Sequence, residues 1–386
     1  MKHLRMAIAV LSIFLFGLFA FSSCNGNLLF SLGDDTTEDD TATALEILER
    51  SLWVVGGLSG NGIDTVVSQI DVFDPVTATW TAGITSLPIP VSFFGAVGYQ
   101  GKLYIIGGYN VLGEAQAAVQ IYDIGSNSWS TGDPLPAARA NIDASLIDGY
   151  VYILSGSNTL SGAAYNSNST TYRYNIVSDS WLVRTAPGTN RINFNQVVHG
   201  GSLYSLGMRS SATAVVTTHD AYIPVVTGTD VISTTPTVLT LAKAGMVADV
   251  YTKPSGTAFL IIIGGHTALV GGLNTNYVFS ARTTYTALNT VQFIRSPFLG
   301  TVVDGSGWNT AAQSLPDVNG YAGGCITNET FYVMGGTKTG TVASPPSGMT
   351  SVYYSDLRTF PSNTWAAGPA MPRGRYGHRV VKVSAN

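Results

Sequence analysis

The chain has 386 residues, of which 45% are hydrophobic, 10% aromatic and only 11% charged. Disordered chains are poor in apolar residues and rich in charge, so this composition excludes disorder for most of the sequence. Carboxylates greatly outnumber bases between Cys24 and Arg50, whereas basic and acidic residues balance from Ser51 onward. Nucleic acid attracts proteins through clustered excess Lys and Arg. The neutral body therefore argues against a nucleic-acid partner.

The first residues have the pattern of an export signal. A basic start precedes the uncharged apolar run from Met6 to Phe21, which is shorter than the roughly 20 residues of a membrane-spanning helix. The residues Phe21-Ser-Ser-Cys24 resemble the lipobox of bacterial lipoproteins, which are cut before a cysteine that is then acylated. The resemblance implies a signal peptide over 1–23 and membrane attachment through Cys24. The alternatives are an ordinary signal peptide or an uncleaved anchor.

A polar, acidic segment follows over residues 24–50. Its charged run, Asp34 to Asp40, repels itself and extends, so we expect a flexible tether between the lipid and the folded body. Cys24 and Cys325 are the two cysteines of the chain. If Cys24 carries lipid, Cys325 has no disulfide partner, and a chain exported without disulfides depends on its core for stability.

One signature recurs about every fifty residues: an apolar, aromatic or β-branched strand that ends in glycine. Its six occurrences are Leu52–Gly57, Leu103–Gly108, Val151–Gly156, Leu203–Gly207, Leu260–Gly265 and Phe331–Gly336. A tryptophan follows the first three and the last of these strands, at Trp80, Trp129, Trp181 and Trp365. Each repeat is too small to bury its own apolar faces, so neighbouring repeats must pack together.

These marks resemble the kelch repeat of β-propellers, over essentially all of residues 52 to 386. The resemblance implies an all-β fold of six four-stranded antiparallel blades, with tryptophans wedged between blades. The repeats begin at Leu52 with what would be the second strand of a blade, and they end with what would be a first strand, Arg375 to Ser384. We therefore expect the C-terminal strand to complete the first blade. We assign the β-propeller to residues 51–386.

The repeat is least regular between Gly207 and Gly336. We interpret this region as two enlarged blades, with an inserted loop over Asn289 to Gly307. Three short blades in the same stretch would instead give seven in all.

Strand direction places the loops after the glycines and the loops before the first strands on one rim. Amide, Tyr and Arg side chains suit hydrogen bonding and stacking against sugars, peptides or anions. The candidate ligand-binding residues are Arg139, Arg191, Arg375, Tyr109, Asn141, Asn193, His266, Tyr321 and Tyr376. The three arginines occupy matching repeat positions, so they form either a ring of ligand-binding guanidinium groups or a set of hydrogen-bond donors to carbonyls within the fold.

Catalytic signals are sparse, and we assign no catalytic residue. The histidines have no metal-pair spacing, and no glycine pair precedes a phosphate-binding helix, so we expect neither a metal nor a cofactor. Kelch-type sugar mutarotases and sialic-acid epimerases need only an acid/base residue and an arginine for a carboxylate. The carboxylates available on the rim are Asp64, Glu114 and Asp317, with Glu114 the best candidate.

The sequence therefore predicts a monomeric, lipid-anchored module of the bacterial cell envelope, at the outer membrane or cell surface. We expect it to present its rim to a protein or glycan partner rather than to act as an enzyme. The alternative is a carbohydrate-active enzyme of the mutarotase or epimerase type at the same rim. A channel plugged by apolar side chains would favour the module, and a tight pocket lined by arginine with one carboxylate of raised pKa would favour the enzyme.

Overall fold

The computed structural model describes residues 47, 50–60, 62–158, 170–187, 191–192, 194–209, 215–216, 220–225, 229–234, 244–270, 284–295, 309–338 and 347–383. The predicted signal peptide, Cys24 and nearly all of the predicted tether lie outside these residues. Within the described ranges, no helix is long and apolar enough to cross a membrane.

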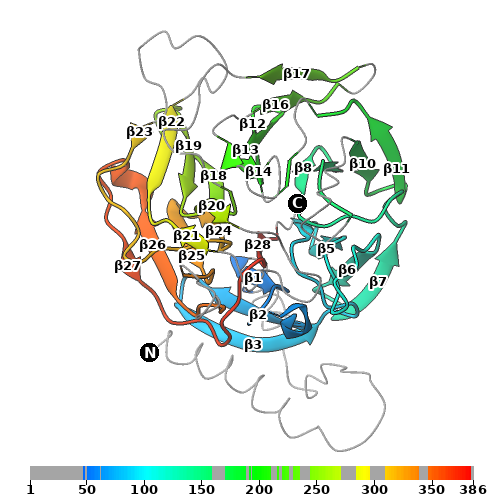
Figure 1. Cartoon of the computed structure of the whole chain (residues 1–386), viewed down its shortest axis with the longest axis horizontal. Coiled ribbons are helices and arrows are strands. Elements are labelled where there is room, and N and C mark those ends of the chain that lie inside the picture. The colour runs from blue at the N-terminus through cyan, green and yellow to red at the C-terminus, as the bar shows by residue number, and fades with distance from the viewer. Residues whose placement is uncertain are drawn as a thin grey trace, which may run out of the picture.

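Six four-stranded antiparallel sheets surround a central axis (Figure 1). From the axis outward, blade 1 contains β28 (Arg379–Lys382), β1 (Leu52–Val55), β2 (Gln69–Asp74) and β3 (Thr79–Ser86); blade 2 contains β4 (Gly95–Tyr99), β5 (Lys102–Ile106), β6 (Val119–Asp123) and β7 (Ser128–Gly132); blade 3 contains β8 (Ser145–Ile147), β9 (Tyr150–Leu154), β10 (Thr171–Asn175) and β11 (Ser180–Arg184).

The other three blades follow the same order. Blade 4 contains β12 (Asn195–His199), β13 (Ser202–Leu206), β16 (Asp220–Ile223) and β17 (Val231–Thr234); blade 5 contains β18 (Val247–Thr252), β19 (Ala258–Ile263), β22 (Val291–Arg295) and β23 (Asn309–Thr310); blade 6 contains β24 (Gly323–Thr327), β25 (Thr330–Met334), β26 (Val352–Asp356) and β27 (Ala366–Ala367). The six-bladed all-β fold is therefore confirmed, and the seven-bladed alternative is wrong.

The C-terminal strand closes the ring as predicted. β28 pairs with β1 in antiparallel register, with Leu52 opposite Lys382 and Val55 opposite Arg379. The six inner strands contact one another in a complete circle, from β4 through β8, β12, β18 and β24 to β28. Closure leaves no inner strand without a neighbouring blade, which protects the sheet edges that face the axis.

The hydrophobic core lies between blades rather than inside any one blade. Six clusters of buried side chains each join residues of two successive blades, such as Trp53 of blade 1 with Ile105 of blade 2. Three of the repeat tryptophans also donate to the preceding blade or to the segment that leaves it: Trp80 to the Pro369 carbonyl, Trp129 to the Thr85 hydroxyl and Trp181 to the Asp133 carbonyl. These contacts confirm the predicted wedging for three of the four tryptophans.

Blades 4 and 5 are enlarged because each carries a two-stranded ribbon in the loop after its glycine strand. The ribbons are β14 (Met208–Arg209) with β15 (Val215–Val216), and β20 (His266–Val270) with β21 (Thr284–Ala287). The expectation of an inserted loop over Asn289 to Gly307 is wrong in its first part, because β22 is the third strand of blade 5. Residues 296–308 lie outside the described structure.

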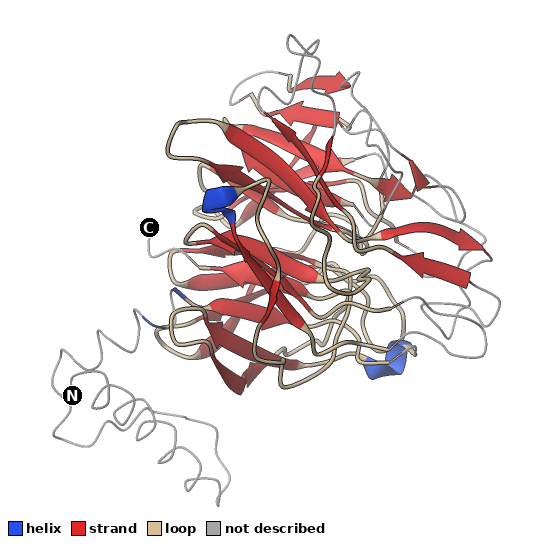
Figure 2. Cartoon of the chain, turned by 90° about the vertical axis from the view of Figure 1, so that its left-hand side faces the viewer, coloured by secondary structure: helices blue, strands red, loops and turns tan. Residues whose placement is uncertain are grey.

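The molecule has two faces. The glycine rim, as we name it, holds the loops that follow the second strands and the loops that enter the inner strands; the hairpin face holds the tight turns. Gly57, which leaves β1 at φ +90°, shows why glycine is needed: an added Cβ would lie 2.6 Å from the His378 Cβ. The short helices η1 (Ile63–Thr65) and η2 (Leu357–Thr359) lie on opposite faces in Figure 2. The described body begins and ends on the hairpin face, because Leu52 pairs with Lys382.

Candidate functional site

The three predicted arginines lie inside the fold and not on the exposed rim. Arg139, Arg191 and Arg375 are 0%, 1% and 0% exposed. Arg139 donates through Nη1 to the carbonyls of Ser155 and Thr170, at 3.0 and 2.6 Å, and its guanidinium stacks over a tyrosine ring of the same blade. This geometry favours the second interpretation made from the sequence, in which the arginines donate to carbonyls of the fold.

Arg375 has the same role in blade 1, with an ion pair in addition. It donates through Nη1 to the carbonyls of Gly56 and Gln69, each at 3.1 Å, and pairs with the buried carboxylate of Asp71. Burial lowers the pKa of Arg375 to about 10, although Asp71 opposes the shift. Arg191 pairs with Asp220 at 2.6 Å in blade 4. Each guanidinium thus bonds to groups near the end of its own glycine strand and is buried from solvent.

A ring of residues with left-handed backbone surrounds the mouth of the central channel at the glycine rim. One residue per loop occupies the same repeat position, and those described are Phe93 (φ 54°), Asn141 (φ 53°), Gly245 (φ 58°), Tyr321 (φ 54°) and Gly377 (φ 60°). Bulky residues are rare in this conformation and persist only where the surrounding structure holds them. The surrounding structure therefore holds two aromatic residues at the channel mouth in an unfavourable backbone conformation.

The aromatic rings fill the space that the neighbouring glycines leave open. An added Cβ would lie 2.8 Å from the Phe93 ring at Gly377, and 2.6 Å from the Tyr321 ring at Gly245. The rings of Phe93 and Tyr321 meet edge to face, with centroids 5.5 Å apart. We call the buried cluster around them the plug, which comprises Leu58, Ile63, Phe93, Tyr109, Ala140, Ala287, Tyr321 and Tyr376.

The other predicted site residues do come together, but as parts of this closure. Asn141 donates to the Tyr109 hydroxyl at 3.1 Å, and Tyr376 donates to the Gly60 carbonyl at 2.8 Å. The His266 ring lies against that of Tyr321, with centroids 4.9 Å apart. All of these side chains are less than 9% exposed. The remaining candidate, Asn193, lies outside the described residues.

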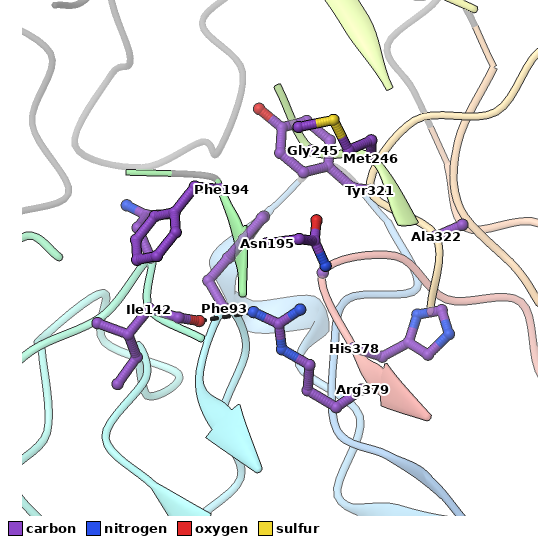
Figure 3. A pocket seen from close by; sticks show the side chains of 12 residues that line it. Phe93, Ile142, Phe194, Asn195, Gly245, Met246, Tyr321, Ala322, His378 and Arg379 are labelled. Carbon is purple, nitrogen blue, oxygen red and sulfur yellow. Dashed lines mark hydrogen bonds between the residues drawn. The ribbon is translucent and has the colours of Figure 1, made fainter. Parts of the chain in front are cut away.

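Beneath the plug lies a cavity of only about 30 Å³ (Figure 3). Arg379 lines it from β28, His378 lines it from the loop before β28, and Asn195 lines it from β12. Burial holds the pKa of His378 well below its ordinary value, and the nearby cations Arg375 and Arg379 lower it further. The imidazole is therefore neutral in the folded protein.

The predicted carboxylates do not reach this cavity. Glu114 accepts a hydrogen bond from the Asn110 side chain at 3.1 Å, and Asp317 pairs with Lys338 at 2.6 Å. Asp64 is exposed, in helix η1. Among the residues with described coordinates, no group of three His, Cys, Asp or Glu side chains could hold a metal ion. The acid/base residue that the enzyme alternative requires is thus not supplied by these three groups.

One loop of the glycine rim projects apolar side chains into solvent. Val111 and Leu112 are 43% and 70% exposed. Asn110 fixes this loop, because its Oδ1 accepts from the backbone N–H groups of Leu112 and Glu114, at 2.9 and 3.0 Å. The loop thus presents large apolar side chains from a pre-organised backbone, an arrangement suited to protein contacts. We did not single out Val111 or Leu112 from the sequence, although two apolar residues between Asn110 and Gly113 are a visible signal.

Comparison with known proteins agrees with the repeat. The Kelch motif model matches residues 90–136. Kelch-like protein 7 of Mus musculus is 30% identical over 137 residues, which is 34% of this chain and 22% of that protein. Kelch-like protein 40a of Danio rerio is 32% identical over 135 residues, again 34% of this chain and 22% of that protein. The chain thus spans about a fifth of the length of these curated relatives.

Two further comparisons extend beyond those relatives. Beta-scruin of Limulus polyphemus is 24% identical over 127 residues, which cover 31% of this chain and 14% of that protein. The solved structure of YjhT superposes with a TM-score of 0.61 at 14% identity, covering 82% of this chain and 97% of that one, a likeness of fold alone. The repeat, the ring of six blades and these similarities together support a kelch-repeat β-propeller.

Proposed function

We propose that this protein is an interaction module that is anchored in the cell envelope through Cys24 and binds a protein partner at its glycine rim. The observation that carries the proposal is the form of that rim. The plug closes the channel mouth with apolar side chains, while the loop at Val111 and Leu112 projects from the same face. A closed mouth beside projecting apolar side chains suits a broad macromolecular contact better than a small substrate.

The position of the residues that lead into β1 supports the anchoring part of the proposal. Arg50 and Ser51 precede β1 at the hairpin face, opposite the glycine rim. A tether that runs from an acylated Cys24 to Arg50 would hold the hairpin face toward the membrane and turn the rim away from it. Apolar side chains on the rim favour a protein partner over a glycan.

Site-specific photo-crosslinking tests the rim. A photoreactive amino acid is placed at Leu112 of the full chain in envelope preparations, and a matched variant carries it at Val177, which is 89% exposed in the β10–β11 turn on the hairpin face. We expect a discrete protease-sensitive adduct at position 112 and none at position 177. An adduct that only glycan hydrolases remove would identify a glycan instead, and adducts at position 177 alone would contradict the proposal.

The anchor has a separate test. The Cys24→Ser variant is expected to lose labelling by a fatty-acid probe and to move from the membrane fraction to the soluble fraction. Membrane attachment that survives this substitution would contradict anchoring through Cys24 but would leave the rim experiment valid.

A further inference from the structure

The interior of the ring beyond the plug has a different chemistry from the rim. A cavity of about 350 Å³ runs between the inner strands, with charged groups supplied by β28, β18 and the start of blade 3. Sites for small molecules commonly have volumes of roughly 300–1,000 Å³. The proposed rim contact makes no use of this space.

Arg379 supplies hydrogen-bond donors at the inner end of the cavity. Its Nε donates to the Phe94 carbonyl at 2.9 Å. Its Nη2 donates to the Ile142 carbonyl at 2.6 Å (Figure 3). Its Nη2 also lies 3.3 Å from the carboxylate of Asp143. Within the described part of the chain, Nη1 of Arg379 makes no hydrogen bond, and neither does the side-chain amide of Asn195, which lines the same space.

Lys382 supplies an ammonium group nearer the hairpin face. Its Nζ donates to the Ile326 carbonyl at 2.7 Å and lies 4.0 Å from Asp249 Oδ2. The side chain is 49% exposed although the ring surrounds it, so water reaches it through the cavity. Burial would lower the pKa of Lys382, but Asp249 and Cys325 together outweigh that effect, so the pKa is raised. The ammonium therefore keeps its charge and has donors left for a ligand.

The two carboxylates are already engaged by backbone donors. Asp143 accepts from the N–H groups of Ala144 and Gln196, at 3.0 and 2.9 Å. Asp249 accepts from those of Val250 and Ile326, at 2.8 and 2.7 Å. These backbone bonds use part of the acceptor capacity of each carboxylate and tie neighbouring inner strands together, whereas Arg379 Nη1 and Lys382 Nζ retain free N–H groups. The cavity consequently offers charged N–H donors to a ligand, and charged donors bind oxyanions most strongly.

We infer that the channel binds a small molecule carrying a carboxylate or phosphate group. Lys382 Nζ is the donor at its entrance, and Arg379 Nη1 and the Asn195 amide are the donors at its inner end. The plug closes the rim end, while Lys382 and Val198 are 49% and 37% exposed at the ends of β28 and β12. The ligand therefore enters from the hairpin face, away from the proposed protein contact.

Calorimetric titration of the full chain tests this inference with three probes: inorganic phosphate, glucuronate and its neutral counterpart glucose. We expect heat from at least one of the two anions, none from glucose, and weaker binding as the salt concentration rises. The Lys382→Gln variant is expected to bind the same anion at least tenfold more weakly. The matched variant Lys102→Gln removes a half-exposed, ion-paired lysine outside the cavity, and its affinity should not change.

A second variant tests the inference even if Lys382→Gln does not fold. Val198→Asp adds a carboxylate to the cavity wall at a side chain that is already 37% exposed, and it should also weaken anion binding at least tenfold. Thermal unfolding confirms that each variant is folded. No heat from either anion, or equal affinities in wild type, Lys382→Gln and Val198→Asp, would overturn the inference. The titration contains no protein partner, so its failure would leave the rim proposal intact.

Discussion

The two ends of the central channel are built from the same repeat and differ in chemistry. At the glycine rim, Phe93 and Tyr321 lean over Gly377 and Gly245 and close the mouth with apolar contacts. Toward the hairpin face, Lys382 lies along the wall of an open cavity. The difference shows that a symmetric backbone fixes where a side chain lies, while the residue at each equivalent position decides whether that end is closed and apolar or open and polar.

The largest expected effect comes from breaking the buried ion pair that supports the rim. Arg375→Ala removes the donor to the Gly56 and Gln69 carbonyls and one cationic partner of buried Asp71. Such losses cost about 4 kcal/mol of the free energy of unfolding, because the partners remain buried. Equilibrium denaturation in urea measures the change.

The control for this experiment is an ion pair on the hairpin face. Arg358 pairs with Asp356, but the two side chains are 70% and 46% exposed. Solvent screens such a pair, so Arg358→Ala should leave the free energy of unfolding unchanged. If Arg375→Ala and Arg358→Ala lowered the free energy of unfolding equally, the buried ion pair at the rim would be no more stabilising than the exposed pair on the hairpin face.

A pair of glycine substitutions tests the closure more finely. Gly377 and Gly101 both have positive φ, at 60° and 69°, but an added Cβ would meet the Phe93 ring at Gly377 and nothing within 4 Å at Gly101. Alanine at Gly101 in the hairpin turn should cost about 1 kcal/mol of backbone strain. Alanine at Gly377 adds overpacking and should cost about 3 kcal/mol. If thermal or urea unfolding showed the same loss of stability for both variants, the Phe93 ring would move aside for the added Cβ at no measurable cost in free energy.

The smallest expected effect is a pH dependence that originates at the rim end. Because the pKa of His378 is lowered well below 6.5, the unfolded chain binds a proton near pH 6.5 that the folded chain does not. The contribution to stability is thus fully present above pH 6.5 and is lost as the pH falls below that value. From about pH 7.5 to about pH 5.5, wild type should lose about 1 kcal/mol more than His378→Phe.

Phenylalanine is the matched replacement, since Phe94 and Phe194 occupy the equivalent position in two other blades. Urea unfolding at several pH values compares the two proteins, and the other titrating groups are common to both. If the stability of wild type and of His378→Phe changed with pH in parallel, burial would not lower the pKa of His378 in the folded protein.

Much of the fold was predictable because it depends on local patterns. The strand that runs from Leu52 to Gly57 and its five counterparts carry their own apolar spacing and glycine ends, so their number gave six blades. The enlarged blades were located from glycine spacing, yet their ribbons were not foreseen. Strand β22 was mistaken for part of a loop, because the repeat is least regular in that region of the sequence.

The candidate site was predicted less well, and the arginines show why. Arg139, Arg191 and Arg375 were correctly placed at matching positions, but whether a loop side chain faces solvent or its own blade depends on how the loop packs. No sequence pattern around Lys382 or Asp249 indicates that either residue lines a cavity. Each lies in a strand whose other residues are mostly apolar. Side chains from distant repeats become a cavity wall only after the ring closes.

The sequence by itself determined the six strands that end in glycine, the six-fold repeat and the pairing of the C-terminal strand with the first blade, because hydrophobic periodicity and glycine turns act over a few residues. Tertiary structure decided the rest. It buried the three arginines against carbonyls, set the rings of Phe93 and Tyr321 over glycines of neighbouring loops, and brought Arg379 and Lys382 to a shared cavity. These outcomes depend on contacts between residues up to several hundred positions apart, which no local pattern encodes.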